Sequence, residues 1–484
     1  MHTHKSIARN TLATNASSVV NRFIGLITSA LLARQLGTEA FGQITLFITF
    51  SAIFLKISDF GMLQYITREV AANISDSARW LRQTLILKSL LLGATALIIA
   101  LALFFVHVSI PTKIIILCSV FFAFGKSYYN VADSFYTAWG KVNYSAFWEF
   151  LYAALVLALI SVLYFLKILG INSAVLIYTV TILIIAAISL FHLNYKFVRL
   201  NSFLPVEFNW SIFTKSYHFF VASLSGIVFL QADILLLRWL HGAEATGYYG
   251  AGLALYSGLV LLIANMSRVT FPVFSKYFKE SLDEFKKNAD RILWYILILL
   301  FPLTAGGIVL SGHIITFIYG HQFAPAAISF SFLLIAFLFH FLGSFLVILL
   351  QSGHQQESAA KINLVAVCLS AVIGIPLIYM YSYVGASVMR VAINFFICIA
   401  CFMVVKGKII KISFSNSLYK PIIATLIMAI ILLLLRGMNL IPLLIIGVAS
   451  YSAVILLLKT FSKNEYSFFV SLFIPKRTFQ GSEK

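Results

Sequence analysis

Residues 15–37 read NASSVVNRFIGLITSALLARQLG, an apolar run of bilayer length that carries an arginine near its middle. A helix needs about 20 mostly apolar residues to cross the hydrocarbon core of a membrane. Arg22 keeps its charge in any protein environment, and an arginine at mid-bilayer costs roughly 2.5–3.5 kcal/mol on insertion scales. We therefore expect a membrane-spanning helix whose charged residue has a role.

The composition of the whole chain is that of an integral membrane protein. Of the 484 residues, 61% are hydrophobic and 11% are charged, and the mean hydropathy is +0.97. A soluble core of this length cannot bury so much apolar surface, so the predicted fold class is an all-α polytopic membrane protein of about 14 transmembrane helices. The predicted spans are 14–35, 41–60, 84–106, 113–138, 145–166, 172–194, 214–239, 246–270, 291–311, 325–350, 361–381, 383–404, 418–436 and 440–460. The short apolar run at 311–320 is interpreted as a loop turn.

Basic residues are distributed unevenly between alternate loops. With the N-terminus in the cytoplasm, 27 of the 35 Lys and Arg residues fall on the cytoplasmic side, five on the outer side and three within spans. Cytoplasmic loops are enriched in Lys and Arg, so both termini are expected in the cytoplasm. This bias, with attraction to anionic lipid, explains the net charge of +19. A nucleic-acid partner would need a soluble basic domain with stacking aromatics, and the sequence has none.

A short motif occurs twice in the chain. GTEAFG at 37–42 and GAEATG at 242–247 share four of six positions at a constant offset of 205. Each copy follows the first span of a six-span block, and an even number of spans keeps both blocks in the same orientation. This predicts two six-helix lobes, 1–205 and 206–410, related by a parallel pseudo-two-fold axis as in many secondary transporters, with the substrate path between them. Residues 411–484 are expected to add two helices and a cytoplasmic tail.

The first span carries a polar stripe along one face. Residues three and four apart share a helix face, and here they are Asn15, Ser18, Arg22, Gly25 and Ser29. Such a face must meet protein or a wet cavity rather than lipid. It predicts either a structural ion pair with an acid on another span or a cationic binding site for an anionic substrate. We favour the binding site, because a charge within the membrane is costly unless it has a function.

Other spans carry charged and amide side chains that are candidates for substrate binding, gating or ion coupling. These are Lys126, Asp133 and Glu149 on spans four and five, Asp233 on span seven, and Arg390 and Asn394 on span twelve. The first three are expected to form a buried charge cluster that locks the lobe, or else to include a proton or cation site. Asp233 is expected to pair either with Arg22 across the cleft, as a gate, or within the second lobe. Arg390 has equal support as a binding residue and as a structural one.

No pattern for catalysis or cofactor binding is found in the sequence. The four cysteines lie in apolar segments without His or acidic partners, which favours packing over metal binding. SDFG at 58–61 resembles a kinase metal motif but lacks the rest of that motif set. P-loop and H-E-x-x-H patterns are missing as well. We expect no enzyme activity, no metal and no cofactor.

Several segments together resemble a known family. RNTLATNASSVVNRFIGLITSALLARQLGTEAFGQITLF at 9–47 and SDFGMLQYITREVAA at 58–72 are similar to the N-terminal signature of bacterial polysaccharide (Wzx-like) flippases, within the multidrug/oligosaccharidyl-lipid/polysaccharide exporter superfamily. The second half supports the resemblance with DILLLRWLHGAEATGYYGAG at 233–252, IYGHQF at 318–323 and LLQSGHQQ at 349–356. QSGHQQ is also a weak echo of AWGKVN at 138–143, which follows span four.

The resemblance implies a bilobed transporter in the bacterial cytoplasmic (inner) membrane. Such proteins flip undecaprenyl-pyrophosphate-linked oligosaccharide units, such as those of O-antigen and lipopolysaccharide biosynthesis, to the outer leaflet by alternating access. The polymerase and chain-length machinery of that pathway are implied partners, besides the lipid bilayer. Relatives that flip the peptidoglycan precursor use cationic residues on the first span, and Arg22 matches that kind of position.

Three alternative functions are weighed against polysaccharide flipping. A flippase for the lipid-linked peptidoglycan precursor fits the residues equally well. A multidrug or small-solute exporter of the same superfamily generally has twelve spans and an acid on the first helix, and span one has no acid. A membrane glycosyltransferase or polymerase would need a large outer loop or paired acids, whereas the outer loops are short.

Overall fold

The computed structural model describes residues 2–105, 109–199, 211–411 and 418–460. For 2–16, and for 211–230 except Ser216 and Phe220, the description covers the backbone alone. Every regular element in these ranges is a helix, as predicted. The elements are α1 (His2–Asp59), α2 (Met62–Ala72), η1 (Ile74–Asp76), α3 (Ser77–Phe105), α4 (Ile110–Ala138), α5 (Val142–Phe165), α6 (Ile171–Leu193), η2 (Asn194–Val198), α7 (Ser211–Glu280), α8 (Leu282–Val309), α9 (Ser311–Tyr319), η3 (His321–Phe323), α10 (Ala326–Ser352), α11 (Gln356–Lys408), α12 (Tyr419–Leu434) and α13 (Leu440–Leu457).

Three of the helices are broken by one residue with non-helical torsion angles. The breaks are at Gly37 in α1, Gly242 in α7 and Ser382 in α11. A straight α1 would be about 87 Å long, far more than the roughly 30 Å of a hydrocarbon core, so each broken helix supplies two spans. Ten helical stretches of the described residues are long and apolar enough to cross a membrane. Dividing the three broken ones and adding the shorter α12 gives the fourteen spans expected from hydropathy.

One element differs from the prediction. The run at 311–320, interpreted as a loop turn, is the helix α9. Although it is too short to cross a membrane, it buries Ile315 and Tyr319 completely against the core. Burial of that apolar face stabilises a helix that its length alone would not.

The two copies of the repeated motif have the same backbone geometry and contact each other. Gly37 and Gly242 both have φ of +82°, a conformation that favours glycine. A Cβ atom on Gly42 would lie 1.9 Å from the carbonyl oxygen of Ala243, and one on Gly247 would lie 2.0 Å from that of Thr38. Thr38 and Ala243 are themselves 205 residues apart, so the two contacts are related to each other by a local two-fold axis. Only glycine allows the backbones of α1 and α7 to approach so closely.

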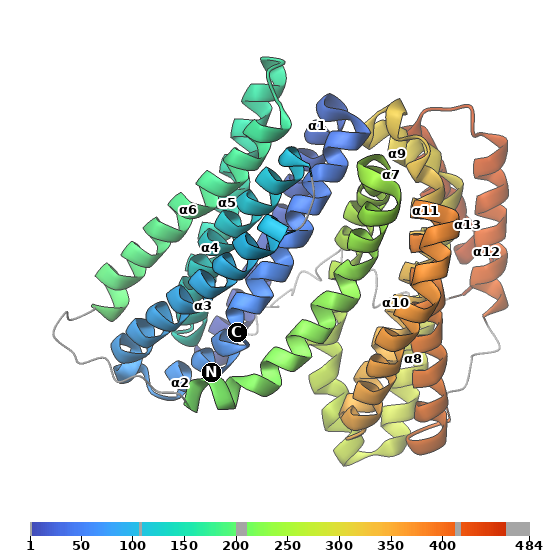
Figure 1. Ribbon diagram of the computed structural model, residues 1–484. Coiled ribbons are helices and arrows are strands. Elements are labelled where there is room, and N and C mark those ends of the chain that lie inside the picture. Colours follow the sequence, from blue (N-terminus) through green and yellow to red (C-terminus); the bar gives the residue numbers. More distant parts are fainter. Residues whose placement is uncertain (1, 106–108, 200–210, 412–417, 461–484) are drawn as a thin grey trace, which may run out of the picture.

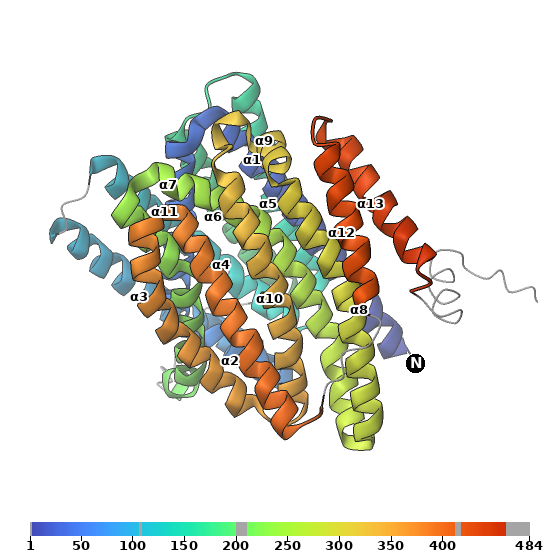
Figure 2. The same cartoon turned by 90° about the vertical axis from the view of Figure 1, so that its right-hand side faces the viewer.

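Figure 1 shows the helices in two bundles, an N-terminal bundle (α1 to α6) and a C-terminal bundle (α7 to α13), which meet near the top of the view and spread apart below. A hydrophobic cluster at the meeting end draws on both bundles, with Phe41 of α1 5.6 Å from Phe323, between ring centroids. Each bundle also has a core of its own. The division at 205 and 410 stays a prediction. Figure 2 shows α12 and α13 at the edge of the C-terminal bundle, beside α8.

Hydrogen bonds between backbone and side chain also connect the two bundles at the meeting end. Arg34 of α1 donates from Nε to the carbonyl oxygen of Ile318 at 3.0 Å. In the other direction, Gln322 donates from Nε2 to the carbonyl oxygen of Ala33 at 2.9 Å. At the opposite end, Phe60 stacks on Phe220 of α7, with ring centroids 4.3 Å apart. The bundles are therefore joined at one end by hydrogen bonds and apolar packing, and at the other by α2 lying against the start of α7.

Candidate functional site

A cavity of about 640 Å³ lies inside the C-terminal bundle, between α7, α10 and α11. Most of its wall is apolar, which is usual for a binding pocket of this size. Polar groups converge on it from all three helices, namely Tyr256, Ser267, Arg268, His340, Ser344, Gln351, Asn363, Arg390 and Asn394. The predicted site residues Arg390 and Asn394 thus line one cavity, together with Arg268, which the sequence did not single out as a site residue.

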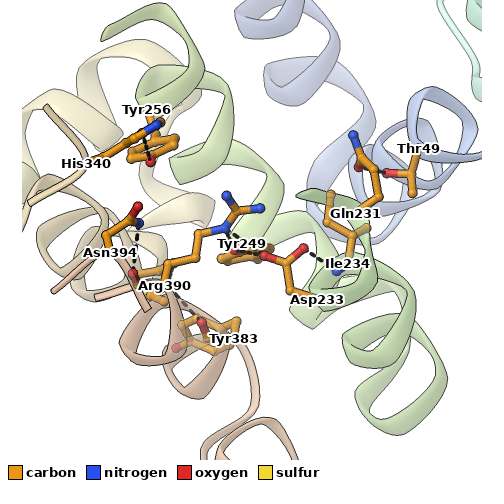
Figure 3. Close-up of polar contacts among 12 residues, drawn as sticks. Thr49, Gln231, Asp233, Ile234, Tyr249, Tyr256, His340, Tyr383, Arg390 and Asn394 are labelled. Atoms are coloured by element: carbon orange, nitrogen blue, oxygen red, sulfur yellow. Dashed lines mark hydrogen bonds and ion pairs between the residues drawn. The ribbon is translucent and has the colours of Figure 1, made fainter. Parts of the chain in front are cut away.

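A buried ion pair stands behind this wall (Figure 3). Arg390 donates from Nε to Asp233 Oδ2 at 2.7 Å, and both side chains are almost fully buried. The hydroxyl of Tyr249 donates to the same carboxylate oxygen and accepts a hydrogen bond from Arg390 Nε. The second carboxylate oxygen accepts from the backbone N–H of Ile234 at 2.9 Å. Asp233 therefore pairs within the C-terminal bundle, one of the two partners expected for it, and Arg22 is not its partner in this structure.

Two neighbouring side chains contact Arg390, one at its backbone and one at its guanidinium. Asn394 donates from Nδ2 to the carbonyl oxygen of Arg390 at 2.9 Å. The guanidinium carbon lies 5.8 Å from the ring centroid of Tyr256, within cation–π range. The Tyr256 hydroxyl lies 2.8 Å from Nδ1 of His340 across the cavity wall. Because Asp233 balances its charge, Arg390 presents an oriented but largely neutralised cation, and Arg268 on the same wall adds a positive charge.

The polar stripe of the first span carries one charged residue, Arg22. The side chain of Arg22 is exposed and makes no ion pair with the residues that the structure describes. A Cβ atom on Gly25, one turn further along, would meet nothing within 4 Å. Ser18 is half-buried, and Ser29 donates to the carbonyl oxygen of Leu26 on its own helix. The side chain of Asn15 lies outside the described residues. This face of α1 therefore borders open space rather than packed protein.

The charged residues of spans four and five form no direct ion pair with one another, although Asp133 and Glu149 are near enough to Lys126 to attract it electrostatically. Lys126 places its ammonium 4.5 Å from the ring centroid of Tyr129 and within range of Tyr152. Neither Asp133, which is half-buried, nor Glu149, which is exposed, lies within ion-pair distance of it. Lys126 and Asp133 are two turns apart on one helix, and the direct contact of the ammonium is an aromatic ring rather than a carboxylate.

A second buried ion pair, in the N-terminal bundle, was missed by the sequence analysis. Lys88 of α3 is completely buried and donates to Asp59 Oδ1 at 2.6 Å and to the carbonyl oxygen of Ser58. Lys88 lies within the predicted span 84–106 and counts among the basic residues of the cytoplasmic side, but its partner is not predicted. The sequence offered one signal for this pair: Asp59 lies at the end of one predicted span, and Lys88 lies inside the next apolar run. Tyr249 was missed too, although it belongs to the repeated segment.

A metal centre is not indicated by the described part of the chain. No three His, Cys, Asp or Glu side chains gather there in a way that could hold an ion.

Comparisons with known proteins give one family and one fold. Residues 7–278 match the family model described as "Polysaccharide biosynthesis protein". The structure is similar to that of the lipid II flippase MurJ in an inward closed conformation, with a TM-score of 0.69, 14% identity, and coverage of 96% of this chain and 100% of that one. An inward-facing multidrug resistance MATE family transporter of the MOP superfamily gives 0.62 at 14% identity, covering 79% and 92%. The Vibrio cholerae MATE transporter VcmN in its bent form gives 0.54 at 12% identity, covering 83% and 96%. No curated protein matches the chain.

Proposed function

The chain belongs to the polysaccharide biosynthesis protein family, and from this we propose that it flips undecaprenyl-pyrophosphate-linked oligosaccharide repeat units across the bacterial inner membrane. The units are those of O-antigen or a similar surface polysaccharide, moved from the cytoplasmic to the outer leaflet. The polymerase and chain-length machinery of the pathway would receive the product.

One observation carries the proposal: Arg22 stands exposed and without an ion-pair partner among the described residues, on a polar face of a membrane-spanning helix. A charge in that position is costly unless it faces water or a ligand. The headgroup of a lipid-linked sugar pyrophosphate is anionic, and a guanidinium offers two parallel hydrogen bonds to phosphate oxygens. Arg22, with Asn15, Ser18 and Ser29 on its face, would hold the pyrophosphate, while the lipid tail remains in the bilayer.

The arrangement of the bundles supports alternating access. The distribution of basic residues puts the Gly42–Gly247 contact at the outer side and both termini in the cytoplasm. In this orientation the bundles meet toward the outside and lie farther apart toward the cytoplasm, where the start of α7 remains beside α2 (Figure 1). Rocking of one bundle against the other around the glycine contact would expose the headgroup outside. Arg390 and Asn394 would bind the sugar units from the C-terminal cavity.

A second candidate function is flipping of the lipid-linked peptidoglycan precursor. The observation that favours it is the match to the lipid II flippase, which covers 96% of this chain and 100% of that one, whereas the matches to MATE exporters cover 79–84% of this chain. The last helices of this chain, α12 and α13, thus have counterparts in a flippase.

Transport by the purified full-length protein in liposomes separates these functions. Three fluorescent substrates are compared: a polyprenyl-pyrophosphate oligosaccharide, the lipid-linked peptidoglycan precursor and a cationic dye. We expect the first to be flipped by the wild type and not by Arg22→Ala. Flipping of the precursor alone would establish the second candidate, and movement of the dye alone would refute both.

A further inference from the structure

A second cavity, of about 450 Å³, lies at the end of the C-terminal bundle where the last turns of α7 approach the junction of α10 and α11. Its wall consists of Phe271, Ser275, Lys279, Gln351, Ser352, His354 and Gln356. Phe271 and Gln351 also line the 640 Å³ cavity, so the two hollows adjoin. We call this 450 Å³ cavity the mouth, and in the proposed orientation it opens at the cytoplasmic face. The proposed function uses none of these wall residues.

The wall of the mouth supplies hydrogen-bond donors and positive charge but no carboxylate. Lys279 is exposed at the rim. Ser352 is only 3% exposed, and its hydroxyl has no hydrogen-bond partner among the described residues. A buried polar group without a partner carries a penalty of about 1–3 kcal/mol, which a bound acceptor would remove. A bound anion would accept a hydrogen bond from this hydroxyl, and the wall has no carboxylate that would repel the anion.

The start of α11 adds a further attraction for anions. Gln356, the first residue of this long helix, belongs to the wall, and no side chain caps the helix. Backbone N–H groups and the positive end of the helix dipole make such a terminus a site for phosphate. The one acid of the first turn, Glu357, is already paired with Lys361 at 2.7 Å and is not part of the wall.

His354 occupies a backbone position that favours glycine. Its φ is +58°, in the left-handed region, and it lies two residues before α11 begins. At the equivalent turn of the N-terminal bundle, two residues before α5, the chain has Gly140 with φ of +66°. A residue with a Cβ atom in this conformation costs about 1–2 kcal/mol. The imidazole is thus held at the mouth against a backbone preference, 5.8 Å from the ring of Phe278.

We infer that this mouth binds the phosphate group of an anionic lipid headgroup, with Lys279, His354, Ser352 and the start of α11 as donors. The phosphate comes either from the pyrophosphate of the lipid-linked substrate or from a glycerophospholipid of the same leaflet. From the mouth, the adjoining cavity leads on to Arg268 and Arg390. The inference deepens the proposed function, and it rests on that function only for the orientation and for the identity of the substrate lipid.

Binding of farnesyl pyrophosphate, a short soluble polyprenyl pyrophosphate, tests the inference. The full-length protein is studied by calorimetry in phosphatidylcholine nanodiscs. Lys279→Ala and His354→Gly are each expected to weaken binding about tenfold or more, because a charge-assisted hydrogen bond is lost. His354→Gly suits the left-handed backbone, so a loss of binding there is not a loss of folding. Lys276→Ala is the matched control, since Lys276 is exposed one turn away, beside Glu280 and outside the cavity wall.

The lipid composition distinguishes the two sources of phosphate. If nanodiscs containing phosphatidylglycerol weaken farnesyl pyrophosphate binding to the wild type but not to His354→Gly, glycerophospholipids occupy the mouth. If they have no effect, the site selects pyrophosphate. Wild-type affinity in both cavity variants, or an equal loss in Lys276→Ala, would overturn the inference. If the binding test fails but the wild type still flips lipid-linked oligosaccharide, the inference is overturned and the proposed function stands. If the wild type binds farnesyl pyrophosphate but does not flip the oligosaccharide, only the proposed function is refuted.

Discussion

Replacing Asp233 with alanine removes the carboxylate that balances Arg390 inside the C-terminal bundle. Asp233 is 2% exposed and Arg390 is 8% exposed, so water reaches the pair only through the wall of the cavity that Arg390 lines. The Tyr249 hydroxyl loses its acceptor at the same time. Breaking a buried ion pair by removing one partner costs about 3–5 kcal/mol of the free energy of unfolding. We predict a loss of this size for Asp233→Ala and a similar one for Arg390→Ala.

The double variant shows whether the two side chains act as a pair. Asp233→Ala with Arg390→Ala leaves no uncompensated charge, so its cost is expected to fall below the sum of the single costs by about 2–3 kcal/mol. The free energy of unfolding is measured by denaturant titration of the purified protein in detergent. The exposed pair Glu284–Lys287 is the control, for which a coupling below about 1 kcal/mol is expected. Additivity of the Asp233 and Arg390 effects within about 0.5 kcal/mol would refute the assignment.

Two further predictions concern the places where helices meet. Gly42→Ala puts a methyl group within 1.9 Å of the carbonyl oxygen of Ala243, so α1 and α7 must separate. We expect a loss of about 1–3 kcal/mol in the free energy of unfolding, and slower flipping. The control is Gly25→Ala, which borders open space and is expected to keep wild-type stability. Lys88→Ala leaves Asp59 without its buried partner. We expect the free energy of unfolding to fall by about 3 kcal/mol or more in the denaturant titration. Unchanged stability would show that water solvates the Asp59 carboxylate.

Much of the fold could be predicted because its determinants are local in sequence. Bilayer-length apolar runs and the glycines of the repeated motif are visible in the sequence, and the structure has spans and reversals where they predict them. The helix α9 could not be predicted this way. Its nine residues are too few to cross a membrane, and burial of Ile315 against residues far away in the chain decides its structure.

The site was less predictable, because a polar stripe fixes a helix face but not the partner on the other side. Asp233 and Arg390 are 157 residues apart, and their pairing depends on how α7 and α11 are rotated against each other. Lys126 contacts the ring of Tyr129 directly, while Asp133 and Glu149 attract it from a longer distance, and a stripe of polar residues does not predict this aromatic contact. The partner of Lys88 could not be predicted, because only the tertiary contact shows Asp59 beside it.

The account depends most on Arg22 as the residue that receives a phosphate-bearing headgroup. The direct measurement is the amount of surface polysaccharide on cells whose only copy of the gene carries Arg22→Ala or Arg22→Lys, with membrane levels of the protein measured in parallel. We predict that Arg22→Ala abolishes the polysaccharide while the protein remains in the membrane, and that Arg22→Lys retains part of it, because lysine keeps the charge without the planar fork. Wild-type polysaccharide levels with Arg22→Ala would contradict the account.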